Sequence, residues 1–111
     1  MIDKLLDTVV VTRDGDEISS RELLQNEKHY LYGEIDASNR DIYLKFSSRQ
    51  ALYDFARSLL QEAVYGQGGR KEFYPLISEG KALVVEGARL LEGSSRIFVE
   101  YGEDDQDLLQ K

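Results

Sequence analysis

The side chain best suited to catalysis in this chain is its single histidine, His29, because an imidazole is the commonest general base. A hydrolytic triad also requires a serine nucleophile and an acid beside that base. His29 stands at the start of a tyrosine-rich stretch, and no nucleophile signature surrounds it. The sequence therefore favours a structural histidine at the end of a strand, and we expect a protein that is not an enzyme.

Two acidic runs and one glycine-rich run are the other stretches that could hold a ligand. The acids of residues 14–17 and 103–107 do not have the spacing of a calcium loop, and no cysteine is present to supply a thiolate. Residues 66–71 contain three glycines and two bases, but they follow a predicted helix. The negative end of the helix dipole would face a phosphate there. We therefore expect no metal site and no cofactor.

Composition limits the class of protein. With 111 residues, 41% hydrophobic and 32% charged, the chain has the size of a single soluble domain. The absence of cysteine fits a reducing compartment, and the first twelve residues carry acids within their apolar stretch, unlike a signal peptide. No apolar run reaches the roughly 20 residues that span a bilayer. We expect a cytoplasmic protein without membrane attachment.

Charge narrows the choice of partner. The 21 acids and 14 bases give a net charge of −7, which repels phosphate backbones and disfavours nucleic acid. Such a charge attracts a basic protein over long range and speeds the encounter. The alternative is that the acidity serves solubility alone. Both interpretations stay open at this point.

The clearest element is a helix predicted over residues 49–65. Ser47 and Gln50 have the spacing of a capping box, and apolar residues recur in adjacent pairs every four positions along one face. Gly66 is predicted to end the helix in a left-handed conformation. The outer face is expected to carry Tyr53, Asp54, Arg57, Ser58, Gln61 and Glu62.

Strands are predicted on both sides of this helix. A first hairpin is expected around residues 8–16, then a loop or helical turn from Ser20, and a second, half-buried hairpin made of residues 29–35 and 42–46. Gly33 within it indicates a bulge or close packing beneath a bulky neighbour. After a mobile connection at 67–72, extended segments are expected at 73–77, 83–86 and 96–101. This order predicts an α+β domain over residues 1–101, an antiparallel β-sheet with one amphipathic helix packed on one face, and an acidic tail at 102–111.

One family resemblance bears on function. Part of the chain resembles the strand-helix-strand layout of short bacterial immunity proteins. This part consists of residues 42–46, which lead into residues 48–56 and Leu59-Leu60, and of the later residues 92–100. Those proteins are encoded beside polymorphic or contact-dependent toxins. The resemblance implies an inhibitor that neutralises a toxin domain by blocking its active site or a basic substrate cleft.

The resemblance suggests two contact faces. Tyrosine among carboxylates suits an interface, because it supplies buried area together with a hydrogen-bonding tip. The candidates are Tyr53, Asp54, Glu62 and Tyr65 on the helix, or Asp14, Asp16 and Glu17 in the first hairpin turn. The main alternative is a non-enzymatic structural or regulatory adaptor that forms a homodimer through its sheet edge. A small enzyme or ligand carrier is a third possibility.

Overall fold

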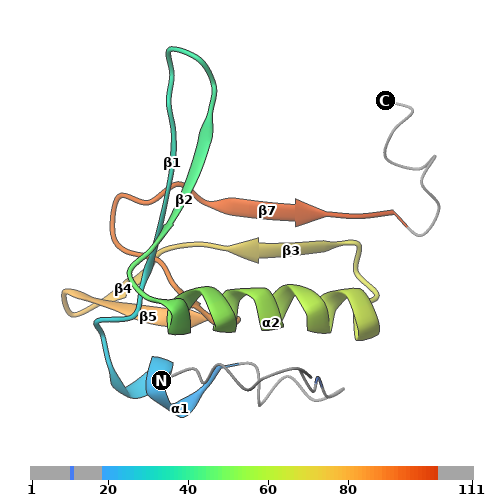
Figure 1. The fold of residues 1–111 in the computed structure, drawn as a ribbon, viewed down its shortest axis with the longest axis horizontal. Coiled ribbons are helices and arrows are strands. Elements are labelled where there is room, and N and C mark those ends of the chain that lie inside the picture. The colour runs from blue at the N-terminus through green and yellow to red at the C-terminus, as the bar shows by residue number, and fades with distance from the viewer. Residues whose placement is uncertain (1–10, 12–18, 103–111) are drawn as a thin grey trace.

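The computed structural model describes Val11 and residues 19–102, coloured in Figure 1. Within this part no helix is both long and apolar enough to cross a membrane. The predicted first hairpin and the acidic tail beyond Gly102 lie outside it. The elements are α1 (Arg21–Gln25), β1 (Leu31–Ile35), β2 (Ile42–Phe46), α2 (Arg49–Tyr65), β3 (Arg70–Phe73), β4 (Leu76–Ser78), β5 (Lys81–Val85), β6 (Ala88–Arg89) and β7 (Ile97–Glu100).

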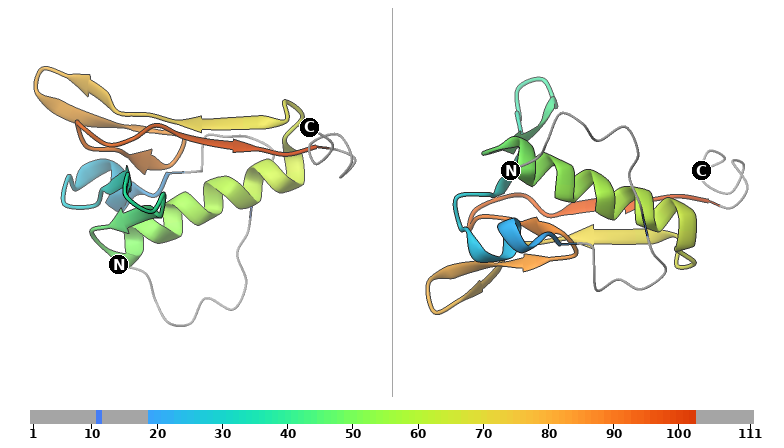
Figure 2. Two further views of the ribbon diagram at one scale, coloured as in Figure 1. Left: turned by 90° about the horizontal axis from the view of Figure 1, so that it is seen from above. Right: turned by 60° about the horizontal axis from the view of Figure 1, so that its bottom comes forward.

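All of these strands pair in antiparallel fashion. β1 pairs with β2, β3 pairs with β7, and β4, β5 and β6 form a three-stranded sheet. The β3–β7 pair joins segments that are far apart in the sequence, and α2 runs along it (Figure 2). The expected α+β fold, with antiparallel sheets and one main helix, is confirmed.

The second predicted hairpin is present as β1 and β2. Its turn forms because the Asp36 carboxylate accepts hydrogen bonds from the Ser38 hydroxyl at 2.7 Å and the Ser38 amide at 2.9 Å, which lower the pKa of Asp36. The hairpin extends beyond the rest of the fold (Figure 1). Ile42 is consequently 71% exposed and Leu44 40% exposed. The expectation that β2 is half buried is therefore wrong for its outer end.

The segment after β6 fastens β1 to the body of the protein. Leu31 forms a parallel bridge with Leu90, and the Gly33 amide donates to the Ser94 hydroxyl at 2.9 Å. A Cβ atom at Gly33 would lie 3.4 Å from the Ile97 side chain. The close packing that the sequence predicts at Gly33 is confirmed.

The apolar core is small and centred on aromatic rings. Phe55 of α2 lies between Phe46 and Phe73, with ring centroids 5.4 Å and 4.8 Å away. Buried aliphatic side chains from β1, from β6 and from Leu90 just after β6 complete the cluster, and side chains of β7 lie at its margin. Since these side chains come from α2 and several strands, the core joins the helix to the sheets.

Helix α2 has the predicted bounds but not the predicted caps. Ser48 is the N-cap, and its hydroxyl accepts from the Ala51 amide at 3.1 Å. Ser47 instead donates to the Lys28 carbonyl. Gly66 is extended, with φ −69° and ψ 153°, so the predicted left-handed cap is wrong. A Cβ atom at position 66 would lie only 2.5 Å from the backbone carbonyl oxygen of Glu62, which accounts for the glycine.

The rotation of α2 also differs from the prediction. In the first three apolar pairs only one member meets the core, namely Ala51, Phe55 or Leu59. In the fourth pair both Ala63 and Val64 are exposed. Asp54 and Ser58, which the sequence places on the outer face, are completely buried. The second members of the apolar pairs face solvent instead: Leu52, Ala56, Leu60 and Val64.

Two short strands were outside the predicted elements. Residues 70–72, expected as a mobile connection, belong to β3 because they pair with β7. β6 has two residues, too few for a periodic pattern. The turn between β4 and β5 contains Glu79 and Gly80, which have positive φ angles of 53° and 78°.

A buried arginine holds α1 and its following loop in place. The Arg89 guanidinium donates to the carbonyls of Asn26 at 3.0 Å and His29 at 2.9 Å, and its Nε donates to Ala82 at 3.2 Å. A longer contact of 3.4 Å reaches Leu24 at the end of α1. Burial lowers the pKa of Arg89. One side chain thus satisfies carbonyls from a helix end, a loop and a strand.

Replacement of this side chain should be costly. We expect Arg89→Met to lower the free energy of unfolding by about 3 kcal/mol, because several carbonyls lose their donor. Urea denaturation followed by circular dichroism measures this loss. The exposed Arg21→Met should change stability by less than about 0.5 kcal/mol. Equal losses in the two variants would show that Arg89 has no special structural role.

Candidate functional site

Asp54, proposed above as a contact residue, is a structural side chain. Its Oδ1 accepts from the Ser20 amide at 2.6 Å, and its Oδ2 accepts from the Ser20 hydroxyl at 3.0 Å and from Gln50 Nε2 at 2.8 Å. Since Asp54 is completely buried, it offers no surface to a partner. Its placement on an exposed contact face is wrong.

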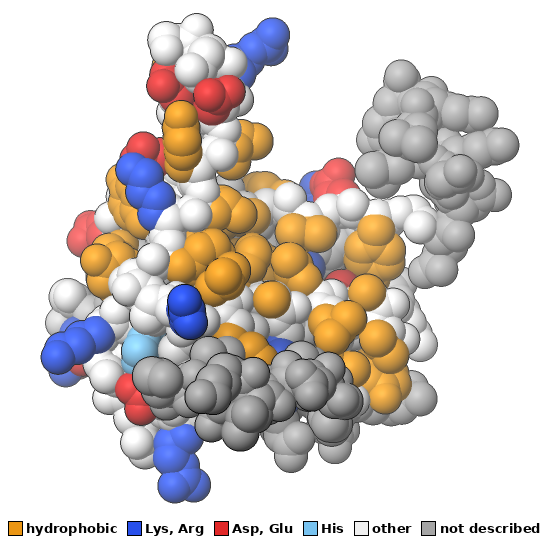
Figure 3. Space-filling model, viewed as in Figure 1, with side chains coloured by type: hydrophobic (Ala, Val, Ile, Leu, Met, Phe, Trp, Pro, Cys, Tyr) orange, Lys and Arg blue, Asp and Glu red, His pale blue; other side chains and the backbone are white. Residues whose placement is uncertain are grey.

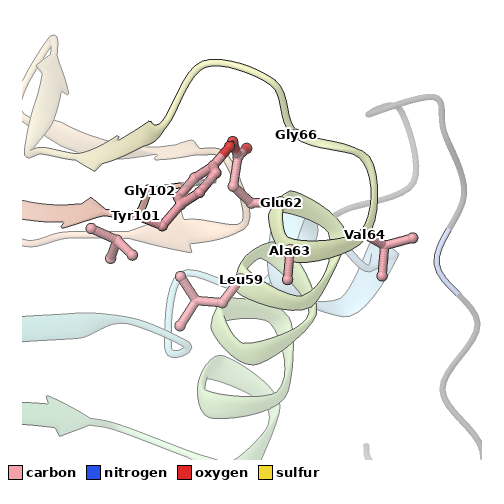
Figure 4. A pocket seen from close by; sticks show the side chains of 8 residues that line it. Leu59, Glu62, Ala63, Val64, Gly66, Tyr101 and Gly102 are labelled. Carbon is pink, nitrogen blue, oxygen red and sulfur yellow. The ribbon is translucent and has the colours of Figure 1, made fainter. Parts of the chain in front are cut away.

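Glu62 is also directed toward the protein rather than outward. Its carboxylate accepts from the Tyr101 hydroxyl and lies 3.8 Å from the buried ammonium of Lys71, which contacts Glu86 at 2.8 Å. Figure 4 shows the Glu62 carboxylate and the Tyr101 phenol pointing at each other. Both side chains line a groove with a volume of about 460 Å³. The groove is lined by Leu59, Glu62, Ala63, Val64, Gly66, Val99, Tyr101 and Gly102. Glu62 therefore stabilises a buried lysine.

The predicted contact residues do not form one face. Tyr53 and Glu62 are nine positions apart, about two and a half helical turns, so they lie on opposite sides of α2. Tyr53 and Tyr65 are both half buried. Asp14, Asp16 and Glu17 lie outside the described residues. Of the helix candidates, only Tyr53 lies on the outward side.

A different surface stands out on the described part of the chain. We call it the hairpin surface: Ile35, Ile42, Leu44 and Phe98, which line one groove of about 190 Å³ between the hairpin and β7. All four side chains are exposed. Hydrophobic side chains spread from the hairpin across this face of the molecule (Figure 3). The sequence did not identify this surface, although the alternation in residues 42–46 marks its apolar side.

Arginines frame the aromatic member of the hairpin surface. The guanidinium carbons of Arg70 and Arg96 lie 5.1 Å and 5.4 Å from the ring centroid of Phe98. Glu100 pairs with Arg70, and Glu72 pairs with Arg96. The charges there are balanced, which leaves the ring as the main exposed feature. Aromatic and arginine side chains of this kind are the commonest energetic centres of protein interfaces.

The net charge is distributed unevenly along the chain. Residues 1–10, 12–18 and 103–111 hold nine acids and three bases, which account for −6 of the net −7. The described residues are therefore close to neutral, and several of their acids form ion pairs. Attraction of a basic partner would depend on the acids outside the described part.

His29 takes part in a hydrogen-bonded chain that resembles a catalytic triad. Its Nδ1 lies 2.6 Å from the Ser48 hydroxyl, and its Nε2 lies 2.8 Å from a Glu22 carboxylate oxygen. The same Ser48 oxygen caps α2 by accepting from Ala51. We interpret the chain as a brace between α1 and α2. The described residues contain no group of three or more histidine or acidic side chains placed to bind a metal ion.

The brace predicts an acid-dependent loss of stability. Hydrogen bonds from His29, and then from Asn26, lower the pKa of Glu22. Because the pKa of Glu22 is lower in the folded protein than in the unfolded chain, its carboxylate contributes stability above the ordinary carboxyl range, near pH 4 to 5. This contribution is lost as the pH falls through the pKa of the folded state. We expect Glu22→Gln to flatten the fall in unfolding free energy between about pH 5 and pH 3. An unchanged slope in pH-dependent urea titrations would argue against the brace.

Comparison with known protein families, with curated proteins and with solved structures finds no match.

Proposed function

We propose that this chain is a non-enzymatic protein-binding inhibitor of the immunity-protein kind, which neutralises a cognate bacterial toxin in the cytoplasm by covering its active site or substrate cleft. The observation that supports the proposal is the hairpin surface. Exposed apolar side chains gathered around one groove are typical of a surface that binds another protein.

Physical chemistry favours a partner at this position. A two-stranded hairpin is marginally stable unless further strands or a helix cover its apolar face. The outer end of β1–β2 holds Ile35, Ile42 and Leu44 in water, beyond the core. Complete burial of such a side chain contributes about 1.5 to 3 kcal/mol. A protein that covers the hairpin would gain affinity from contacts that the free chain leaves unmade.

The acidic segments would serve a second purpose in this proposal. Asp14, Asp16 and Glu17, together with the acids of residues 103–107, would attract a basic partner and raise the association rate. The hairpin surface would then determine the dissociation rate. Salt should therefore weaken binding mainly by lowering the association rate.

The first test is capture of the partner from a lysate of the source cell, at low and high salt. We expect wild type to retain one stoichiometric basic protein, less of it at high salt, and Ile42→Asp to weaken retention at least about tenfold. Leu83→Asp is the matched control, because Leu83 is an exposed leucine on a different hairpin. This variant should retain the partner as well as wild type does.

The second test asks whether the captured protein is a toxin. Its expression without this chain should stop growth, and co-expression of wild type, but not of Ile42→Asp, should restore it. Recovery of the chain alone, as a homodimer, would favour the adaptor alternative. A captured partner that is harmless on its own would contradict the inhibitor function.

A further inference from the structure

The outward side of α2 is a second exposed surface, separate from the hairpin surface. Because the helix advances 100° per residue, its solvent-facing positions form one continuous strip along its length. We call this strip the α2 seam: Arg49, Leu52, Tyr53, Ala56, Arg57, Leu60, Ala63 and Val64. Its three large aliphatic side chains, at positions 52, 60 and 64, are exposed.

The seam contains a hole of the shape that helix packing uses. Tyr53, Ala56, Arg57 and Leu60 line a concavity of about 70 Å³. Their spacing is i, i+3, i+4 and i+7, the set of four residues that receives one side chain of a facing helix in knobs-into-holes packing. Ala56 has the smallest side chain of the four, which allows a facing backbone to approach. Tyr53, Ala56, Leu60 and Ala63 continue the alternating spacing of three and four.

The charge of the seam specifies what can bind there. Both charged residues of the seam are arginines, Arg49 and Arg57, and no ion pair joins either of them to another described residue. The two acids of α2, Asp54 and Glu62, are directed inward. The seam is therefore apolar and cationic, although the whole chain is acidic.

We propose that the α2 seam docks an amphipathic helix of another protein, with aliphatic side chains along its centre and acids along its flanks. A second copy of this chain fits less well, because α2 packed on α2 would bring arginines together without an acid to pair them. The docking helix would place an aliphatic side chain in the hole and carboxylates beside Arg49 and Arg57.

The test uses two synthetic probes of about three heptads with leucine at both core positions. One probe has glutamate at the flanking positions, and the other has lysine. Fluorescence anisotropy should show the glutamate probe binding at least about tenfold more tightly, with a loss of this preference at high salt. Equal binding of the two probes, or binding of neither, would overturn the proposal.

Variants of this chain test whether the probe binds at the α2 seam and whether this site is independent of the hairpin surface. Leu60→Asp should abolish binding, and Arg57→Glu should reverse the preference in favour of the lysine probe. Leu83→Asp is the matched control, since Leu83 is 41% exposed and Leu60 is 40% exposed. Ile42→Asp, which tests the hairpin surface, should leave probe binding unchanged. Equal effects of Leu60→Asp and Leu83→Asp on probe binding would contradict the proposal. A wild-type homodimer that Leu60→Asp dissociates would also contradict it.

Discussion

The buried carboxylate of Asp54 determines how the main helix sits in this protein. A buried carboxylate without hydrogen bonds is destabilising by several kcal/mol, so α2 must turn Asp54 toward its donors on Ser20. Once this rotation is set, Phe55 enters the core. The other half of the apolar stripe, including Leu52 and Leu60, is left in solvent. The α2 seam is therefore a consequence of one polar contact.

Polar contacts also stabilise the parts that the small core does not reach. Arg89 fixes the end of α1 and the loop before β1, and the His29 brace joins that loop to the start of α2. The Arg89 contacts satisfy backbone carbonyls with a side chain from a distant part of the sequence. Exposed apolar side chains remain on the β1–β2 hairpin and on the outward side of α2, among other places.

Local pattern predicts the elements of this fold better than their orientation. The apolar repeat and the glycine that follows it locate α2, and alternation locates β2. The apolar stripe on α2, however, consists of pairs of adjacent residues. Its periodicity is therefore equally consistent with the first members or the second members of the pairs facing the core. The choice depends on Asp54 and Ser20, which are 34 positions apart. The sequence predicts Asp54 and Glu62 on the surface, because the partners that hold them inward cannot be recognised without the fold. The exposure of Ile42 similarly depends on where the core ends.

The rotation of α2 can be measured directly, because the chain has no native cysteine. Single variants Ser58→Cys and Leu60→Cys place a thiol on the buried and outward sides of the helix. In the native state, the thiol at position 58 should react with a maleimide at least about a hundredfold more slowly than in urea, while position 60 reacts at nearly its unfolded rate. Similar native rates at the two positions, or faster labelling at 58, would contradict the orientation on which the α2 seam depends.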